Sequence, residues 1–246
     1  MKLISSELEI NAYKGLVNEL VNTTIPSNQL LAHLPLFLSR SSLQHILFMS
    51  DLYRRILDVQ GDVIEFGVRW GRNLALFLSF RNIFEPHNYI RKVLGFDTFE
   101  GFKSVSDEDG NNPIVKEGNL AVSDSWEIKL AEILELHQNL SPRPHLKQFE
   151  LIKGDVINTF PEYLEAHPDK IIALAYFDMD IYKPNLEALK AVIPHLTKGS
   201  ILGFDELCVS EFPGETIALK EIIDISKHKI IRSPYSGNQS FIVWGN

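Results

Sequence analysis

The sequence predicts an α/β fold in which a seven-stranded, mainly parallel sheet carries helices on both faces. From Asp62 onward, short apolar runs alternate with segments of helical periodicity, which is the pattern of successive βα units. A turn-rich segment too short for a crossover helix joins the last two apolar runs, so the last strand should be antiparallel. We expect residues 1–60 to form an N-terminal helical extension and residues 61–246 to form the main domain.

The expected elements follow this alternation along the chain. We expect strands at residues 63–66, 93–96, 149–152, 171–177, 200–204, 229–231 and 240–244. We expect helices at residues 41–57, 74–84, 124–139, 157–166, 186–196 and 217–225. A serine pair can cap the first of these helices. Asp124 and Glu127 resemble a capping box for the helix at 124–139.

A long insert, residues 98–147, separates the second and third expected strands. It begins with a polar stretch in which Asp107, Glu108 and Asp109 are expected to form a solvated loop. Long excursions at the C-terminal edge of a parallel sheet are commonly lids or substrate loops. Both a functional lid and a plain insertion remain open from this pattern.

Composition and charge exclude several classes of protein. The chain has 246 residues, with 24 Lys and Arg against 32 Asp and Glu, which gives a formal net charge of −8. Because there is no concentrated basic run, we expect neither a nucleic-acid partner nor a membrane partner. The single cysteine, Cys208, excludes an internal disulfide and a zinc module. We find no secretory signal and no apolar span, and we expect a cytoplasmic protein.

A candidate cofactor loop follows the first strand. That strand ends with Glu65 and is followed by Gly67, Gly71 and a helix. Glycines at such a strand end allow a tight turn and close approach to a ligand. The dinucleotide fingerprint G-x-G-x-x-G is missing, which disfavours NAD and FAD. Glu65 can accept hydrogen bonds from the ammonium group of S-adenosylmethionine, and the alternative is an ordinary turn with a solvated Glu.

The next two strands also end in acidic residues. Asp97 stands where a carboxylate can accept from both hydroxyls of a ribose, and Glu100 is the alternative if the loop is tighter. The third strand ends at Gly154 and Asp155, which can meet the adenine edge. Asp155 can instead serve only as the cap of the next helix.

Three carboxylates follow the fourth and fifth strands. Asp178 ends the fourth strand, and Asp205 and Glu206 end the fifth. Adjacent parallel strands end at the same sheet edge, so these groups should converge. Crowded carboxylates repel unless they are protonated or bridged, and a hard cation such as Mg²⁺ or Mn²⁺ removes the conflict. The alternative is that each carboxylate separately caps a helix.

Four motifs together resemble the macrocin O-methyltransferase family. They are Ile64-Glu-Phe-Gly-Val-Arg-Trp-Gly71, Phe96-Asp-Thr-Phe-Glu-Gly101, Phe177-Asp-Met-Asp-Ile-Tyr182 and Gly203-Phe-Asp-Glu206. The resemblance implies a class I (Rossmann-like) methyltransferase fold, with S-adenosylmethionine and Mg²⁺ as cofactors. It also implies that Asp178, Asp205 and Glu206 are the metal ligands. The residues expected to bind the cofactor are Glu65, Gly67, Val68, Gly71, Asp97, Phe99, Glu100, Gly154, Asp155 and Asp178.

Three departures from related enzymes bear on the chemistry. Glu206 stands where the family often has a second aspartate, and the segment 113–120 lacks the family's histidine. Besides Asp178, the groups that can assist deprotonation are therefore Glu117 and Asp180. Ile181 stands where catechol-type enzymes carry lysine, which favours an aliphatic alcohol as acceptor.

These observations lead to one functional hypothesis with two alternatives. We expect a homo-oligomeric S-adenosylmethionine-dependent O-methyltransferase that acts on a sugar hydroxyl, by resemblance that of a nucleotide-linked 6-deoxyhexose. A divalent metal would chelate the acceptor. The alternatives are a metal-dependent methyltransferase of a phenolic or antibiotic scaffold, and a non-catalytic protein that binds S-adenosylmethionine.

Overall fold

The computed structural model describes residues 6–245, which divide into two compact units between Leu47 and Phe48. The first unit contains α1 (Glu7–Val21), α2 (Ser27–His33), the short 3₁₀ helix η1 (Leu34–Phe37) and the beginning of α3 (Arg40–Arg54). Ser6 and Glu9 form a capping box that satisfies main-chain N–H groups at the start of α1. An N-terminal helical extension is therefore present, but the first unit ends at Leu47, whereas the expected extension runs to residue 60.

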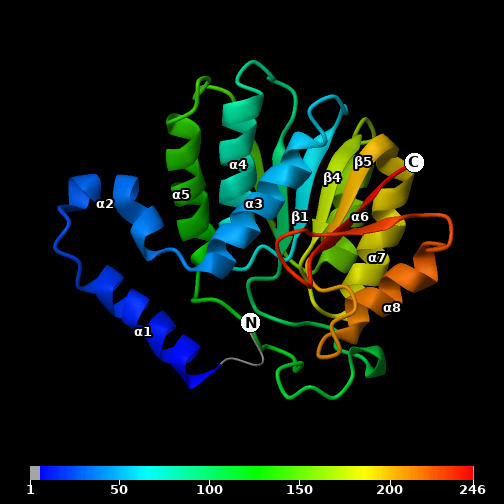
Figure 1. Cartoon of the computed structure of the whole chain (residues 1–246). Coiled ribbons are helices and arrows are strands. Elements are labelled where there is room, and N and C mark those ends of the chain that lie inside the picture. The colour runs from blue at the N-terminus through cyan, green and yellow to red at the C-terminus, as the bar shows by residue number, and fades with distance from the viewer. Residues whose placement is uncertain (1–5, 246) are drawn as a thin grey trace. The chain divides into compact units, whose positions relative to one another are not determined.

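The second unit is built on a seven-stranded sheet (Figure 1). Its strands are β1 (Asp62–Phe66), β2 (Val93–Asp97), β3 (Phe149–Lys153), β4 (Ile172–Phe177), β5 (Leu196–Phe204), β6 (Ile230–Arg232) and β7 (Ser240–Val243). They lie in the order β3-β2-β1-β4-β5-β7-β6, and β7 runs antiparallel to both β5 and β6. This order and reversal confirm the class I methyltransferase fold.

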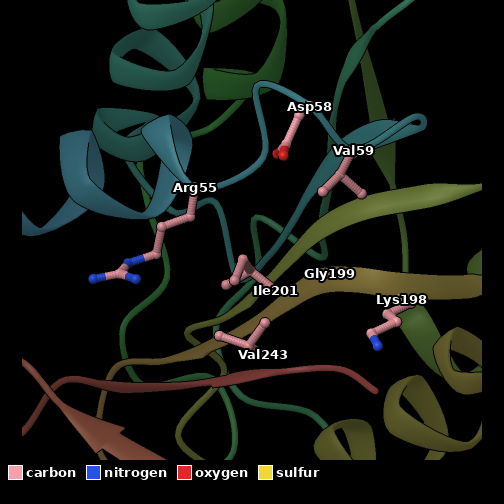
Figure 2. A pocket seen from close by; sticks show the side chains of 7 residues that line it. All are labelled: Arg55, Asp58, Val59, Lys198, Gly199, Ile201 and Val243. Carbon is pink, nitrogen blue, oxygen red and sulfur yellow. The ribbon is translucent and has the colours of Figure 1, made fainter. Parts of the chain in front are cut away.

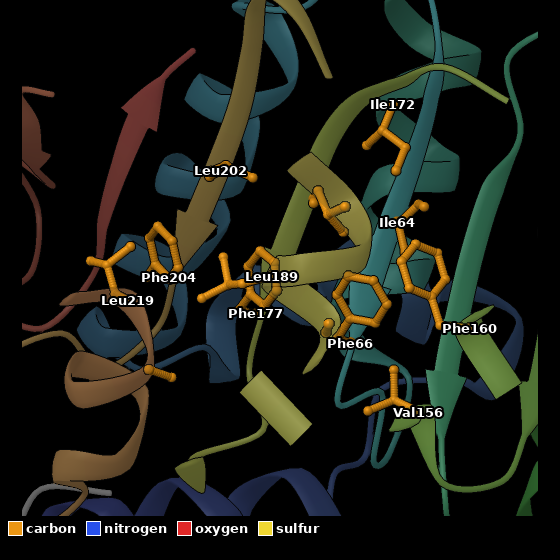
Figure 3. Close-up of a cluster of buried hydrophobic side chains, with 14 of the residues drawn as sticks. Ile64, Phe66, Val156, Phe160, Ile172, Phe177, Leu189, Leu202, Phe204 and Leu219 are labelled. Atoms are coloured by element: carbon orange, nitrogen blue, oxygen red, sulfur yellow. The ribbon is translucent and has the colours of Figure 1, made fainter. Parts of the chain in front are cut away.

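Helices cover both faces of this sheet. They are the end of α3, α4 (Arg72–Phe84), α5 (Trp126–Asn139), α6 (Val156–Ala166), α7 (Tyr182–Val192) and α8 (Pro213–Ile222), with the short 3₁₀ helices η2 (Asp107–Asp109) and η3 (Ile193–His195). On one face, alternate side chains of the strands pack against α6, α7 and α8. Figure 3 shows this core, in which Phe66, Phe160 and Phe177 make close ring contacts. Stacking of Phe177 on Phe204 extends the core toward β5.

The opposite face is covered by the end of α3 and by α4. The α3 side chains Phe48, Leu52 and Tyr53 are fully buried, and Tyr53 contacts Phe77 of α4 through its ring. Burial on both faces explains why β4 reads as a continuous apolar run rather than as an alternating one. The sheet therefore holds the ends of β1, β2, β4 and β5 in fixed register.

Several element boundaries differ from the sequence expectation. β5 begins at Leu196 rather than at residue 200, and α7 begins at Tyr182 rather than at residue 186. The capping box predicted for α5 is wrong. Ser125 occupies the cap position with a φ of 59° and makes no side-chain cap hydrogen bond, while Glu127 instead pairs with Lys153 at 2.8 Å.

Among residues 6–245, no helix has the length and apolar content needed to cross a lipid bilayer.

Candidate functional site

Main-chain hydrogen bonds bind the carboxyl ends of four strands into one edge. The N–H group of Gly67 donates to the carbonyl of Phe96 in β2 over 3.0 Å, and those of Asp178 and Asp205 donate to the last carbonyls of β1 and β4 over 2.9 and 3.1 Å. Side chains that follow these strands therefore begin from neighbouring positions, as the parallel topology predicts.

Two glycines shape the loop after β1. Gly67 has a φ of +90°, and a Cβ there would overlap the main-chain carbonyl oxygen of Asp178. Gly71 has a φ of +88°, and a Cβ there would overlap the side chain of Leu130 on α5. Both positions combine a left-handed backbone with a close approach, so a larger residue would be strained at either one. Val68, between them, is buried.

Glu65 is a buried acid. It is 1% exposed, and both carboxylate oxygens are buried without a hydrogen bond of normal geometry. Burial raises the pKa of Glu65 well above its usual range, and the nearby charge of Asp178 raises it further, while Asn73 opposes the shift. The alternative of a solvated Glu in an ordinary turn is therefore wrong. A cationic group of a ligand would relieve this arrangement.

Asp97 holds the loop that follows β1. Its carboxylate accepts from the N–H of Arg69 at 2.7 Å and from the N–H of Phe99 at 2.5 Å. Burial raises the pKa of Asp97, and these main-chain donors oppose the rise. Phe99 is buried, with a φ of 58°. Glu100, the alternative acid, is exposed and pairs with Lys103 at 3.0 Å.

The end of β3 lies beside Asp97. The N–H of Gly154 donates to the carbonyl of Asp97 over 2.8 Å. Asp155 caps α6, because its carboxylate accepts from the N–H of Ile157 at 3.0 Å. Asp155 thus has the helix-capping role that the sequence left open. A contact to adenine stays a prediction.

Four partly buried carboxylates gather at the ends of β4 and β5, those of Asp178, Asp180, Asp205 and Glu206. Burial raises the pKa of Asp178 well above its usual range, followed by the charges of Asp205 and Asp180. Burial, followed by the charge of Glu206, also raises the pKa of Asp180 well above its usual range. Burial also raises the pKa of Glu206 to about 7. These groups therefore interact strongly, as their positions at adjacent strand ends predict.

Backbone strain marks the same loop. Asp180 has a φ of +62°, a conformation that costs a non-glycine residue free energy and that clusters at functional sites. The loop after β4 is thus held in a conformation that its sequence does not favour locally.

Sequence reasoning missed a fifth carboxylate, Glu215 on α8. It is fully buried, and its Oε1 accepts from the N–H of Glu206 at 3.1 Å. Its Oε2 is buried without a partner, and burial raises its pKa well above the usual range. An acidic residue in the first turn of a helix is ordinary, so only its place next to Glu206 in three dimensions identifies it.

Sequence reasoning also missed the two donors that hold Asp205. The hydroxyl of Tyr176 and the side-chain amide of Gln239 both donate to Asp205 Oδ1, over 2.5 and 2.8 Å. Burial, followed by the charge of Asp205, raises the pKa of Tyr176 well above its usual range. Tyr176 therefore keeps the proton that it donates.

The insert packs onto this side of the sheet edge. Phe102 and Val115 form a small apolar core with Ile181 and Phe212, which lie in the loops after β4 and β5. Asp109 is 1% exposed and accepts from the N–H of Tyr182, at the start of α7, over 2.5 Å. The expectation of a solvated loop is wrong at Asp109, because this buried contact fixes it.

Glu117 of the insert and Trp70 of the glycine loop are both exposed. Glu117 is exposed, unlike the carboxylates of Asp178 and its neighbours. Trp70, in the glycine loop, is 47% exposed and meets Trp126 of α5 edge to face, with ring centroids 5.0 Å apart. The glycine loop and the second half of the insert are therefore in contact.

The carboxylates match a divalent cation in chemistry but not in preformed geometry. Within residues 6–245, no three His, Cys, Asp or Glu side chains are arranged as a metal-binding group. The donor type fits Mg²⁺ or Mn²⁺, because these ions prefer oxygen ligands and neutralise crowded carboxylates. Glu206 Oε2 is also buried without a partner. Ligation by Asp178, Asp205 and Glu206 would require Asp178 and Glu206 to turn toward Asp205, whose side chain is held by two donors.

A pocket elsewhere in the second unit has no part in this site. Figure 2 shows that it lies where β5 begins and β7 ends, with Arg55, Asp58 and Lys198 among its lining residues. This is the sheet edge opposite to Asp178 and Asp205.

Comparison with known proteins identifies close structural relatives. No protein-family model and no curated protein matches the chain. The crystal structure of CalS11, a calicheamicin methyltransferase, matches with a TM-score of 0.96 and 40% identity over 99% of this chain and 95% of that chain. The apo structure of CalS11, a TDP-rhamnose 3'-O-methyltransferase of calicheamicin biosynthesis, matches with a TM-score of 0.88 and 36% identity over 99% and 97%. The O-methyltransferase NovP shares the fold, with a TM-score of 0.62 and 18% identity over 81% and 79%.

Proposed function

The chain belongs to the family of S-adenosylmethionine-dependent O-methyltransferases that includes CalS11, the macrocin O-methyltransferase family, and we propose that it methylates a hydroxyl of a TDP-linked deoxysugar. The full-length likeness to a TDP-rhamnose methyltransferase is the observation that carries this proposal. TDP-rhamnose is accordingly the first acceptor to test.

The ends of β1, β2 and β3 form the proposed cofactor side. Glu65 would accept from the ammonium group of S-adenosylmethionine, since both of its oxygens are buried without a hydrogen bond of normal geometry. Gly67 and Gly71 allow the ligand to approach the backbone. Asp97 would hold the ribose while keeping its bonds to the loop, because each carboxylate oxygen can accept more than one hydrogen bond. Val68, Phe99, Glu100, Gly154, Asp155 and Asp178 complete the proposed contacts.

The ends of β4 and β5 form the proposed acceptor side. Asp178, Asp205 and Glu206 are the residues that would hold a divalent cation, whose charge would lower the pKa of an acceptor hydroxyl. S-adenosylmethionine would supply the methyl group to the acceptor hydroxyl and would be released as S-adenosylhomocysteine. A carboxylate must take up the hydroxyl proton. Asp180 is favoured over Glu117 because it lies among the other carboxylates, whereas Glu117 is exposed.

The insert would supply further walls of the acceptor pocket. The apolar contact of Phe102 and Val115 with the loops after β4 and β5 supports a lid role for residues 98–147. The exposed apolar side chains of Leu8, Tyr13 and Val21 on α1 support a homo-oligomer.

Incubation of the protein with S-adenosylmethionine and TDP-rhamnose tests the proposal. We expect TDP-rhamnose to gain the mass of one methyl group, and we expect activity in Mg²⁺ or Mn²⁺ to disappear in a chelator. Methylation of a phenolic acceptor and not of any TDP-sugar would contradict the proposed substrate. Full activity in the chelator would contradict the metal role alone.

A further inference from the structure

Two donors from different strands hold the side chain of Asp205. Its Oδ1 accepts from the Tyr176 hydroxyl at 2.5 Å and from Gln239 Nε2 at 2.8 Å. Tyr176 is fully buried on β4, and Gln239, which directly precedes β7, is 5% exposed. Since both donors meet the same oxygen, Oδ2 is the oxygen that Asp205 offers to a ligand at the sheet edge.

Strand register explains why Gln239 reaches Asp205. β5 and β7 are antiparallel, with Phe204 opposite Ser240. The residue after Phe204 therefore faces the residue before Ser240, and these are Asp205 and Gln239. Side chains that face each other across an antiparallel pair lie on the same side of the sheet. The antiparallel pairing of β7 with β5 thus places the Gln239 amide next to the Asp205 carboxylate.

The approach of Tyr176 depends on a glycine. Tyr176 is paired with Gly203 in the parallel register of β4 and β5. A Cβ on Gly203 would lie 2.7 Å from Cδ2 of the Tyr176 ring, which is closer than real side chains come. The ring therefore lies across Gly203, and its hydroxyl reaches Asp205, the residue directly after β5.

The Gln239 amide is itself oriented by a neighbour. The hydroxyl of Ser236 donates to Gln239 Oε1 over 3.0 Å, which directs Nε2 toward Asp205. The carbonyl of Gln239 accepts from the N–H of Ser233 at 2.8 Å. The segment between β6 and β7 thus holds Gln239 in place, although that segment lies outside every motif of the resemblance.

We propose that Tyr176 and Gln239 are positioning residues for methyl transfer, which fix the direction in which Asp205 presents Oδ2 to the acceptor side. The inference rests on the proposed role of Asp205 in holding the acceptor. Repulsion from neighbouring carboxylates such as Asp178 would otherwise turn the Asp205 side chain away. Two donors on one oxygen oppose that rotation, and partners of this kind orient groups at active sites.

Removal of each donor tests the inference. Tyr176→Phe deletes the hydroxyl, and Gln239→Met deletes the amide while keeping the length of the side chain. With S-adenosylmethionine, TDP-rhamnose and Mg²⁺, each variant should lose about 10–100-fold in kcat. The KM for S-adenosylmethionine should not change, because the proposed cofactor side lies at β1 and β2.

A matched control separates positioning from stability. Tyr53 is also fully buried and also donates to a carboxylate, that of Glu85, at 2.6 Å. Tyr53→Phe thus removes the same kind of hydrogen bond away from the site. It should lower the unfolding temperature about as much as Tyr176→Phe does, with kcat unchanged.

Asp205→Asn tests the premise, which is the role of Asp205 in holding the acceptor, separately from the positioning role of Tyr176 and Gln239. If Asp205→Asn is inactive while Tyr176→Phe and Gln239→Met keep the wild-type kcat, the positioning role is refuted. An equal loss of kcat in Tyr53→Phe would also refute it, because the effect would then be one of stability. Full activity of Asp205→Asn would refute the role of Asp205 and the positioning role with it.

Discussion

Two parts of the sheet edge, the end of β2 and the ends of β4 and β5, differ in how far the protein itself supplies hydrogen-bond donors to the acidic side chains. At the end of β2, main-chain N–H groups of Arg69 and Phe99 satisfy Asp97, so this half holds its acid without outside help. At the ends of β4 and β5, burial and the charges of neighbouring carboxylates raise the pKa values of Asp178 and Asp180. The first half is complete as it stands, whereas the second requires a proton, a cation or a polar substrate to relieve the crowding.

Glu65 lies where the two halves meet. Its strand, β1, pairs with both β2 and β4, and the charge of Asp178 contributes to its raised pKa. From this difference we infer that the proposed cofactor side is mainly preformed. In the proposed acceptor side, we expect the carboxylates to change their protonation or their contacts when a ligand binds. The variants below test that division of roles.

The largest effect is expected at Asp180. Asp180→Asn removes the carboxylate favoured to take up the hydroxyl proton and should lower kcat by about 10²–10⁴-fold. Glu117→Gln is the matched control, since Glu117 is exposed and should be replaceable with little change in kcat. Steady-state kinetics with TDP-rhamnose measures both variants. The reverse ranking would assign the proton transfer to Glu117.

A large effect on stability is expected at Gly67. Gly67→Ala places a Cβ against the carbonyl of Asp178 at a φ of +90°, which should cost about 2–4 kcal/mol of unfolding free energy. Gly237→Ala is the control, because no atom lies within 4 Å of a Cβ there. Urea denaturation measures both. Equal stability of the two variants would show that the ends of β1 and β4 are not packed as described.

A moderate effect is expected where the insert meets α7. Asp109→Ala leaves the partly buried N–H groups of Tyr182 and Ser106 without an acceptor and should cost about 1–3 kcal/mol of unfolding free energy. It should also raise the KM for TDP-rhamnose while leaving the affinity for S-adenosylhomocysteine unchanged. Asp107→Ala, at an exposed neighbour, should do neither. An unchanged KM in Asp109→Ala would mean that the insert is no wall of the acceptor pocket.

The smallest effect is expected at Asp155. Asp155→Ala removes the cap of α6 and should lower the unfolding free energy by about 1 kcal/mol. Asp155→Ser keeps an acceptor at the cap and should restore most of that loss. If the alanine variant is as stable as wild type, the cap contributes nothing. The affinity of the serine variant for S-adenosylmethionine measures any contact of the carboxylate with adenine.

The sequence predicts what depends on neighbouring residues along the chain. Alternating apolar and helical segments locate the strands, and parallel topology then brings Asp178 and Asp205 to one edge. The same reasoning locates the glycine loop, because Gly67 and Gly71 follow a strand directly.

Long-range contacts account for what the sequence does not predict. Gln239 reaches Asp205 only through the register of β5 and β7, 34 residues away in the chain. Burial of Asp109 depends on a main-chain N–H group 73 residues away. The capping box failed for the same reason, since Glu127 pairs with Lys153, 26 residues further on. No local pattern encodes such partners.

Calorimetric titration with S-adenosylhomocysteine, carried out on wild type and on Asp205→Ala, tests the division of the sheet edge most directly. If the β1–β2 half binds the cofactor by itself, both proteins will bind with the same affinity, although only the wild type will methylate TDP-rhamnose. Loss of S-adenosylhomocysteine binding in Asp205→Ala, or heat with NAD and none with S-adenosylhomocysteine in the wild type, would contradict the account.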